Sequence, residues 1–237
     1  MDLKEEEILG GKVDNHWYYA SKAAAMRTYL EQDSYPHVLD VGAGSGFFTK
    51  YLMKDGATKR GTCVDTGYAE DHAETIDGHP LDFVRSYTKP DADLILFMDV
   101  LEHVPDDVAL LKAYTDQTRA GTEVFITVPA FPFLWSGHDV FLEHYRRYTT
   151  KALEATVIGA GLTPVRCTYY FGAVFPLAAG LRLLRKSANS EQEPKSDLRQ
   201  HSPAVNQGLK LLCTLERPFV RYNRLAGLSV FCLARKD

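Results

Sequence analysis

The feature that most constrains the fold is a turn with three glycines at alternate positions. It follows an apolar run at 37–41 and precedes an apolar, helix-compatible segment at 47–53. Glycine gives the backbone conformations that a Cβ would forbid, and it lets a ligand approach the main chain at the start of the next helix. The order strand, tight turn, helix predicts an α/β unit whose turn is a docking edge for a nucleotide-sized ligand.

The spacing of the glycines discriminates between nucleotides. A dinucleotide fingerprint, G-x-G-x-x-G, requires a third glycine where the chain has Phe47. With an aspartate at its head, the run D-x-G-x-G-x-G instead resembles motif I of the class I S-adenosylmethionine-dependent methyltransferases. The resemblance implies S-adenosylmethionine as cofactor, cradled at its methionine and ribose parts. The residues implicated are Asp40, Gly42, Ala43, Gly44 and Gly46. A glycine-rich turn without a ligand is the alternative.

Two further acids end predicted strands. The run 60–65 reads as a second strand, and Asp65 stands where a doubly wound fold presents a carboxylate to the ribose hydroxyls of a nucleoside. A turn-capping acid is the alternative role. The run 92–99 reads as a buried strand, and the D-V-L-E-H-V that begins at Asp99 resembles motif IV of the same family. The resemblance implies that Asp99 lines the methionine end of the cofactor.

An N-terminal helix is predicted over 14–31, with Asp14 or Asn15 as its cap and several alanines in its interior. An aromatic cluster, Trp17 to Tyr19, opens this helix. Large aromatic side chains usually pack in a core, so packing against the sheet is one expectation. The other is that one ring, for which we take Tyr19 as the candidate, helps to close the cofactor pocket.

The remaining elements complete a predicted α/β fold. Strands are predicted at 81–85, 122–129, 163–170 and 228–235, and helices at 106–119 and 151–161. The family resemblance implies a three-layer, doubly wound, seven-stranded and mostly parallel sheet with an antiparallel last strand. We expect one domain over 1–237, with a helical cap at 1–34, a core at 35–170 and 226–237, and a helical insertion or lid at 171–225 between strands six and seven.

A second informative stretch lies at 131–149, just past the end of a strand, where substrate pockets form in such folds. Its H-D followed by H-x-R-R-Y-T resembles a subset of small-molecule and lipid- or glycan-modifying methyltransferases. We predict His138 or His144 as general base. The expected substrate contacts are Trp135, Asp139, Arg146 and Arg147, together with His103 from the D-V-L-E-H-V run, which could instead be a base or a loop-fixing histidine.

This stretch has two other interpretations. A structural network would pair the two arginines with carboxylates and use Thr149 to cap the helix from Lys151. A metal site built from His138, Asp139 and His144 matches no known ligand spacing, so no metal is predicted. Substrate binding and the structural network both stay open.

Charge is distributed unevenly. The net charge is −4, but residues 1–164 hold 15 Lys and Arg against 26 Asp and Glu, whereas residues 165–237 hold 12 against 5. Within the insertion, apolar residues recur at helical spacing over 205–222 with basic residues between them, and Pro218 should kink or split that helix. The segment is either a helical cap over the substrate pocket or a basic amphipathic surface that touches a membrane or a lipid-linked substrate.

Further sequence features indicate the cellular location and the role of the cysteines. Four widely spaced cysteines indicate neither a disulfide framework nor a zinc site. The acidic N-terminus lacks a secretory pattern, and no apolar run is long enough to span a membrane, so we expect a cytoplasmic protein, with membrane association through 171–225 as an option. A polar stretch at 187–202 should be an exposed or mobile loop. The oligomeric state is left open.

Methyl transfer to a small molecule or to a lipid- or glycan-linked intermediate, at oxygen, is the predicted function. The transfer is an in-line displacement, so the enzyme mainly positions its reactants, and a histidine suits the removal of a hydroxyl proton at neutral pH. The alternatives are a nucleotide-dependent oxidoreductase and a non-catalytic S-adenosylmethionine-binding scaffold. Nucleic acid is not an expected partner, because no N-P-P-Y-type motif follows the fourth strand and the excess of basic residues lies in the C-terminal part.

Overall fold

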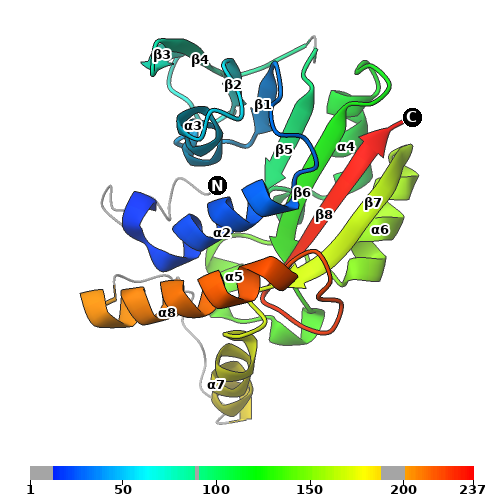
Figure 1. Cartoon of the computed structure of the whole chain (residues 1–237). Coiled ribbons are helices and arrows are strands. Elements are labelled where there is room, and N and C mark those ends of the chain that lie inside the picture. Colours follow the sequence, from blue (N-terminus) through cyan, green and yellow to red (C-terminus); the bar gives the residue numbers. More distant parts are fainter. Residues whose placement is uncertain (1–12, 89–90, 188–200) are drawn as a thin grey trace.

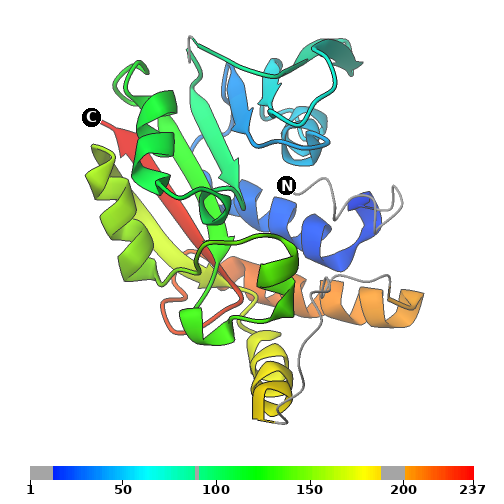
Figure 2. The same ribbon diagram turned by 180° about the vertical axis from the view of Figure 1, so that it is seen from behind.

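A computed structural model describes residues 13–88, 91–187 and 201–237. They form an eight-stranded sheet in the order β3-β4-β2-β1-β5-β6-β8-β7, with helices on both faces (Figures 1 and 2). The strands are β1 (Val38–Val41), β2 (Gly61–Val64), β3 (His72–Ile76), β4 (His79–Val84), β5 (Leu94–Met98), β6 (Glu123–Pro129), β7 (Leu162–Tyr170) and β8 (Ser229–Lys236).

The five central strands, β4, β2, β1, β5 and β6, run parallel to one another. In the middle of the sheet, Leu39 of β1 stands opposite Thr62 of β2 and Ile95 of β5. The last strand, β8, runs antiparallel between β6 and β7, as predicted. The carboxyl ends of β1, β2, β5 and β6 therefore meet at one edge of the sheet, which is where ligands bind in open α/β folds.

The prediction of seven strands was wrong by one. The additional strand, β3, pairs antiparallel with β4 at the edge of the sheet. Four of its five residues are exposed, so it has no apolar run that would reveal it in the sequence. The sequence signal was the turn, Asp77-Gly78, in which both residues have positive φ (49° and 81°), as a tight hairpin requires. This short hairpin extends the sheet beyond β4.

Two helical layers cover the sheet. On one face, α2 (Trp17–Tyr29), α3 (Phe47–Lys54) and α8 (Pro203–Glu216) pack in one hydrophobic cluster, and on the other, α4 (Asp107–Thr115) and α6 (Thr150–Gly159) pack in a second. The remaining helices are α5 (Gly137–Phe141), α7 (Phe175–Ser187) and the short 3-10 helices η1 (Val13–Asn15), η2 (Leu101–His103), η3 (Pro132–Leu134) and η4 (Arg217–Phe219). Among the described residues, no helix is both long enough and apolar enough to cross a membrane.

The N-terminal helix begins later than predicted. Residues 13–15 form η1, so Asp14 and Asn15 do not cap α2; His16 holds the cap position without a side-chain cap bond. Instead, Asn206 of α8 accepts the backbone N–H of Trp17 at 2.8 Å through its side-chain oxygen. A residue far away in the sequence therefore satisfies a donor that local sequence alone could not assign. Residues 1–12 of the predicted cap lie outside the described residues.

The predicted cap of α6 is confirmed, because the Thr149 hydroxyl accepts the N–H of Ala152. Asp106 caps α4 by accepting the N–H of Ala109. The helix α8 ends at Glu216 and η4 follows it, so Pro218 splits this segment as predicted. The segment 171–225 contains α7, α8 and η4. Most of the predicted polar loop at 187–202 lies outside the described residues, and the division of the chain into cap, core and insertion stays a prediction.

Candidate active site

The glycine turn leaves the carboxyl end of β1 and leads into α3. Gly42 and Gly46 have φ of 67° and 71°, in the left-handed region that favours glycine. A Cβ at Gly42 would lie 2.8 Å from Val100, and a Cβ at Gly46 would lie 2.9 Å from both Cys63 and Phe83. Glycine is therefore required at both positions for two reasons, the backbone conformation and the close approach of neighbouring side chains.

Asp65 lies against this turn. One of its carboxylate oxygens accepts the N–H of Gly44 at 3.0 Å, and the other accepts the N–H of Gly67 at 2.8 Å. The hydroxyl of Tyr68 donates to the carbonyl of Gly44 at 2.6 Å. A carboxylate has about four lone-pair sites, so Asp65 retains the capacity to accept hydroxyl groups of a ligand. Its predicted contact with ribose stays a prediction, as do the contacts of Ala43 and the turn glycines.

Asp40 lies beneath the turn rather than on its surface. It is 1% exposed, and one carboxylate oxygen accepts the hydroxyl of Thr49 at 2.9 Å. Burial raises the pKa of Asp40 to about 6. The carboxyl group thus supports the turn from within the sheet, and direct contact between Asp40 and a cofactor remains a prediction.

Asp99 ends β5 at the same edge and has a φ of 55°, which is rare for a residue with a side chain. Its carboxylate pairs with the ammonium of Lys22 from α2 and accepts the hydroxyl of Thr127 from β6 at 3.1 Å. Lys22 is fully buried and also donates to the hydroxyl of Tyr18 at 3.0 Å. Tyr19 of α2 packs against Phe47 and Phe48 of α3, and its contact with a cofactor stays a prediction.

The ion pair between Lys22 and Asp99 keeps both groups charged inside the protein. Burial alone would lower the pKa of Lys22, but the Asp99 carboxylate and the Tyr18 hydroxyl outweigh it and raise that pKa. Burial would likewise raise the pKa of Asp99, but the Lys22 ammonium holds it below its ordinary value. A preformed charge pair therefore faces the end of the sheet where the glycine turn lies.

The stretch 131–149 folds back onto two strand ends. The N–H of Phe131 donates to the carbonyl of Tyr148 at 2.8 Å, which fixes both ends of the stretch beside β6. The N–H of Tyr145 donates to the carbonyl of Glu102 at 2.7 Å, which ties the middle of the stretch to the segment after β5. These two contacts bring His144 to the D-V-L-E-H-V run, a proximity that sequence spacing could not reveal.

Asp139 organises this stretch from its interior. Its side chain is completely buried and accepts from Arg147 at 2.6 Å, from Nδ1 of His144 at 3.0 Å and from the N–H of Ser136 at 2.8 Å. Burial acts to raise the pKa of Asp139, but the hydrogen bond from His144 and the charge of Arg147 prevail and lower it. An ionised Asp139 therefore holds the His144 ring in one orientation.

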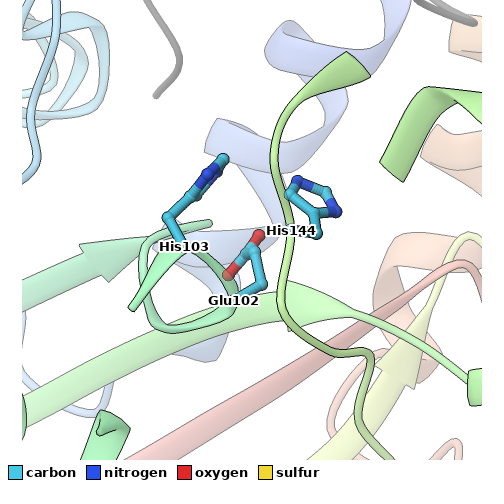
Figure 3. A group of neighbouring side chains, drawn as sticks. All are labelled: Glu102, His103 and His144. Carbon is cyan, nitrogen blue, oxygen red and sulfur yellow. The ribbon is translucent and has the colours of Figure 1, made fainter. Parts of the chain in front are cut away.

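Glu102, His103 and His144 form a compact cluster (Figure 3). The histidine rings lie on two sides of the Glu102 carboxylate, one from η2 and the other from the loop after α5, and their centroids are 4.7 Å apart. Glu102 is 1% exposed. Burial and the nearby Asp99 charge raise the pKa of Glu102. A cluster of this composition can bind or release a proton next to the Asp99 pair.

The other predicted site residues are distributed around this cluster. His138 lies in α5 with its ring 6.2 Å from that of His144, and Trp135 is 38% exposed at the end of η3. Arg146 donates to the carbonyls of Val104 and Pro105 and pairs with Asp107 at 3.2 Å. Both arginines thus have protein partners, which agrees with the structural network that was one of the open interpretations. The substrate contacts stay predictions.

Sequence reasoning missed two residues of the site. Lys22 lies in an alanine-rich helix whose sequence indicates only packing against the sheet. The signal that could have revealed it is a basic residue four positions after Tyr18 on a largely buried helix. Glu102 stood inside the motif that was recognised but was given no role. Only its burial and its position between two histidines distinguish it.

Comparisons with known proteins identify the family. A family model described as a methyltransferase domain matches residues 15–166, which is more than half of the chain. The ubiquinone biosynthesis O-methyltransferase of Citrobacter koseri is 29% identical over 104 residues, which cover 38% of this chain and 41% of that protein. The matched part therefore spans about two fifths of the length of this curated relative.

Two solved structures share the fold. A SAM-dependent methyltransferase from Archaeoglobus fulgidus superimposes with a TM-score of 0.53 at 14% identity, over 99% of this chain and 98% of that one. Phosphoethanolamine N-methyltransferase 2 of Haemonchus contortus, solved in complex with S-adenosyl-L-methionine, has a TM-score of 0.54 at 13% identity, over 92% and 52%. The chain belongs to the methyltransferase domain family.

Proposed function

We propose that the protein is an S-adenosylmethionine-dependent methyltransferase that transfers the methyl group to a hydroxyl oxygen of a small molecule or of a lipid- or glycan-linked intermediate. The observation that carries the proposal is the pairing of Asp139 with Nδ1 of His144, beside Glu102 and next to the Asp99 pair. An oriented histidine at this position can act as a general base when the acceptor must lose a proton. The resemblance to O-methyltransferases of ubiquinone biosynthesis points to the same acceptor atom.

Different residues of the chain bind the cofactor, take the proton and hold the histidine in place. When bound, S-adenosylmethionine supplies a methyl carbon made electrophilic by its sulfonium. Asp65 and the glycine turn bind the ribose part, and the charge pair of Asp99 and Lys22 binds the methionine end. His144 takes the proton of the acceptor hydroxyl on Nε2, because its Nδ1 is engaged by Asp139. Arg147 keeps Asp139 ionised rather than binding the substrate.

The surface of the insertion supports a lipid-linked acceptor. Large apolar side chains are exposed on α7, α8, η4 and the segment after η4: Leu177, Leu181, Val205, Leu211, Leu212, Leu215, Phe219, Tyr222 and Leu225. Basic residues, Lys210, Arg217 and Arg224, are interspersed with them, and the acid Glu216 is engaged by the N–H groups of Gly172 and Ala173. Exposed apolar and basic side chains together suit an anionic lipid surface. A helical cap over the substrate pocket is the other role for this segment.

The test follows the label from methyl-tritiated S-adenosylmethionine into small-molecule, lipid, protein and nucleic-acid fractions of a cell extract. The proposal expects label in the small-molecule or lipid fraction that withstands mild alkali, since an ether survives conditions that cleave a methyl ester. His144→Gln should lower the rate about 100-fold or more, as loss of a general base does. His72→Gln, at an exposed edge strand, is the matched control. Label only in protein or nucleic acid, or no label at all, would contradict the proposal.

A further inference from the structure

The cluster of Glu102, His103 and His144 has the composition of a metal site. One ligand atom from each residue lies within 4.8 Å of the other two. The sequence predicted no metal, and the set it considered used His138 and Asp139. In the structure, Asp139 is committed to Arg147 and to Nδ1 of His144, and Glu102 takes the place of the carboxylate ligand. We propose that Glu102, His103 and His144 bind one divalent transition-metal ion.

Glu102 supplies the first independent observation. Its side chain is almost completely buried, and its Oε2 atom has no hydrogen-bond partner among the described residues. A buried polar atom without a partner is destabilising and calls for a compensating ligand. A cation is a favourable partner for this carboxylate, because a positive charge beside a buried carboxylate stabilises its ionised form.

The contacts of His144 supply the second independent observation. Metal-bound histidines commonly donate the other ring N–H to a carboxylate, which fixes the tautomer and the orientation of the ring. Here Nδ1 of His144 is 3.0 Å from Asp139, so the N–H lies on Nδ1 and the lone pair on Nε2. Asp139 is itself held by Arg147 and by the N–H of Ser136. The chain thus builds the supporting contacts that a ligand histidine requires.

The ligand types indicate the class of ion. Two imidazoles and one carboxylate form the ligand set of several catalytic zinc sites, and imidazole favours zinc, cobalt, iron and nickel over magnesium or calcium. Three protein ligands leave at least one position of a four-coordinate ion for another oxygen. The inferred site is therefore of the open kind that serves catalysis rather than of the closed structural kind.

The site stands on geometry alone, whereas the role of the ion rests on the proposed function. A cation at this position would bind the acceptor hydroxyl and lower its pKa, as a bound zinc ion does for water. The O–H bond then breaks and releases its proton to solvent, and the oxygen forms a bond to the methyl carbon as the carbon–sulfur bond breaks. His144 acts in that case as a ligand, and the ion takes over the activation that the histidine alone would provide.

Titration of the protein of residues 1–237 with Co²⁺ tests the site by visible absorption, which is intense when N and O ligands hold the ion in a site of low coordination number. We expect one Co²⁺ per chain, competition by Zn²⁺, and loss of the band in both Glu102→Gln and His144→Ala. His72→Ala, which removes an exposed histidine elsewhere, should keep the band.

The controls separate the outcomes. Circular dichroism verifies that each variant folds, and calorimetry with S-adenosylmethionine shows whether its cofactor site is intact. Absence of the band in a folded parent protein would overturn the metal site, and so would a band of equal intensity in either ligand variant. Failure to bind S-adenosylmethionine with the cobalt band present would overturn the proposed function and leave the metal site standing.

Discussion

The pKa values of four carboxyl groups in and near the candidate site are shifted in opposite directions by their surroundings. Asp139 and Asp99 have cationic partners, and their pKa values are lowered. Asp40 and Glu102 lie within the protein without a cation bonded to them among the described residues, and burial raises their pKa values. The partners, rather than depth alone, decide which carboxyl groups are ionised at neutral pH.

Asp139→Asn should destabilise the protein by about 3 kcal/mol at pH 7, because Arg147 stays buried without its counter-charge. The folded pKa of Asp139 is lowered, so its contribution is complete above the unfolded value of 3.8 and disappears as pH falls below that value. Urea denaturation of parent and variant across pH measures this difference. A constant difference down to the acid limit would contradict the ionised pair.

Asp40→Asn should have the opposite effect. The folded pKa of Asp40, about 6, lies above its unfolded value of 3.8, so the parent loses stability as pH rises between these values. The variant removes this loss while Thr49 can still donate to the amide oxygen. We expect a gain of up to about 3 kcal/mol at pH 7 that vanishes below pH 4 in the same denaturation experiment. A less stable variant at pH 7 would show that the charge of Asp40 is stabilising.

At the scale of elements, the glycine turn joins β1 to α3 and carries the cofactor site. Gly46→Ala and Gly56→Ala form a matched pair, since both residues have positive φ (71° and 76°). A Cβ at Gly56 meets nothing within 4 Å, whereas one at Gly46 meets Cys63 and Phe83.

Gly56→Ala should cost only the backbone strain, about 1 kcal/mol, and leave cofactor binding unchanged. Gly46→Ala should cost more and weaken S-adenosylmethionine binding more than tenfold, because the turn must move. Calorimetry and thermal melts measure both effects. Equal effects of the two substitutions would show that the turn adapts and that side-chain crowding does not define it.

The elements that could be predicted are those with a local signal. Buried strands such as β5 can be predicted because they are apolar runs in the sequence. The start of α6 can be predicted from its threonine cap. The hairpin strand β3 could not be found by hydrophobicity, because an exposed edge strand needs no apolar face. The cluster of Glu102 with His144 was equally hidden, since it depends on a backbone hydrogen bond between segments 43 residues apart in the chain. Local patterns specify elements, and long-range contacts assemble the site.

At the scale of the whole molecule, the helical insertion exposes several large apolar side chains, and basic residues stand between them in the sequence. Vesicles that contain phosphatidylglycerol should sediment the protein, and vesicles of phosphatidylcholine alone should not, because cationic residues contribute only at an anionic surface. Raised salt should release the protein.

Leu215→Ser combined with Phe219→Ser should reduce vesicle binding about tenfold or more, because two apolar anchors are lost. Ile158→Ser is the control, since Ile158 is an exposed apolar residue on α6, outside the insertion. Equal binding to both vesicle types, or an unaffected double variant, would favour the role of a helical cap over the substrate pocket.

The central claim is that the edge formed by the glycine turn, Asp65 and Asp99 binds S-adenosylmethionine. Isothermal titration of the parent protein should show one binding event per chain. Asp65→Ala should weaken it about 10- to 100-fold through the loss of charge-assisted hydrogen bonds, and Asp116→Ala, at the end of α4, should leave it unchanged. Absence of binding to the folded parent protein, or equal affinity in Asp65→Ala, would contradict this assignment of the site.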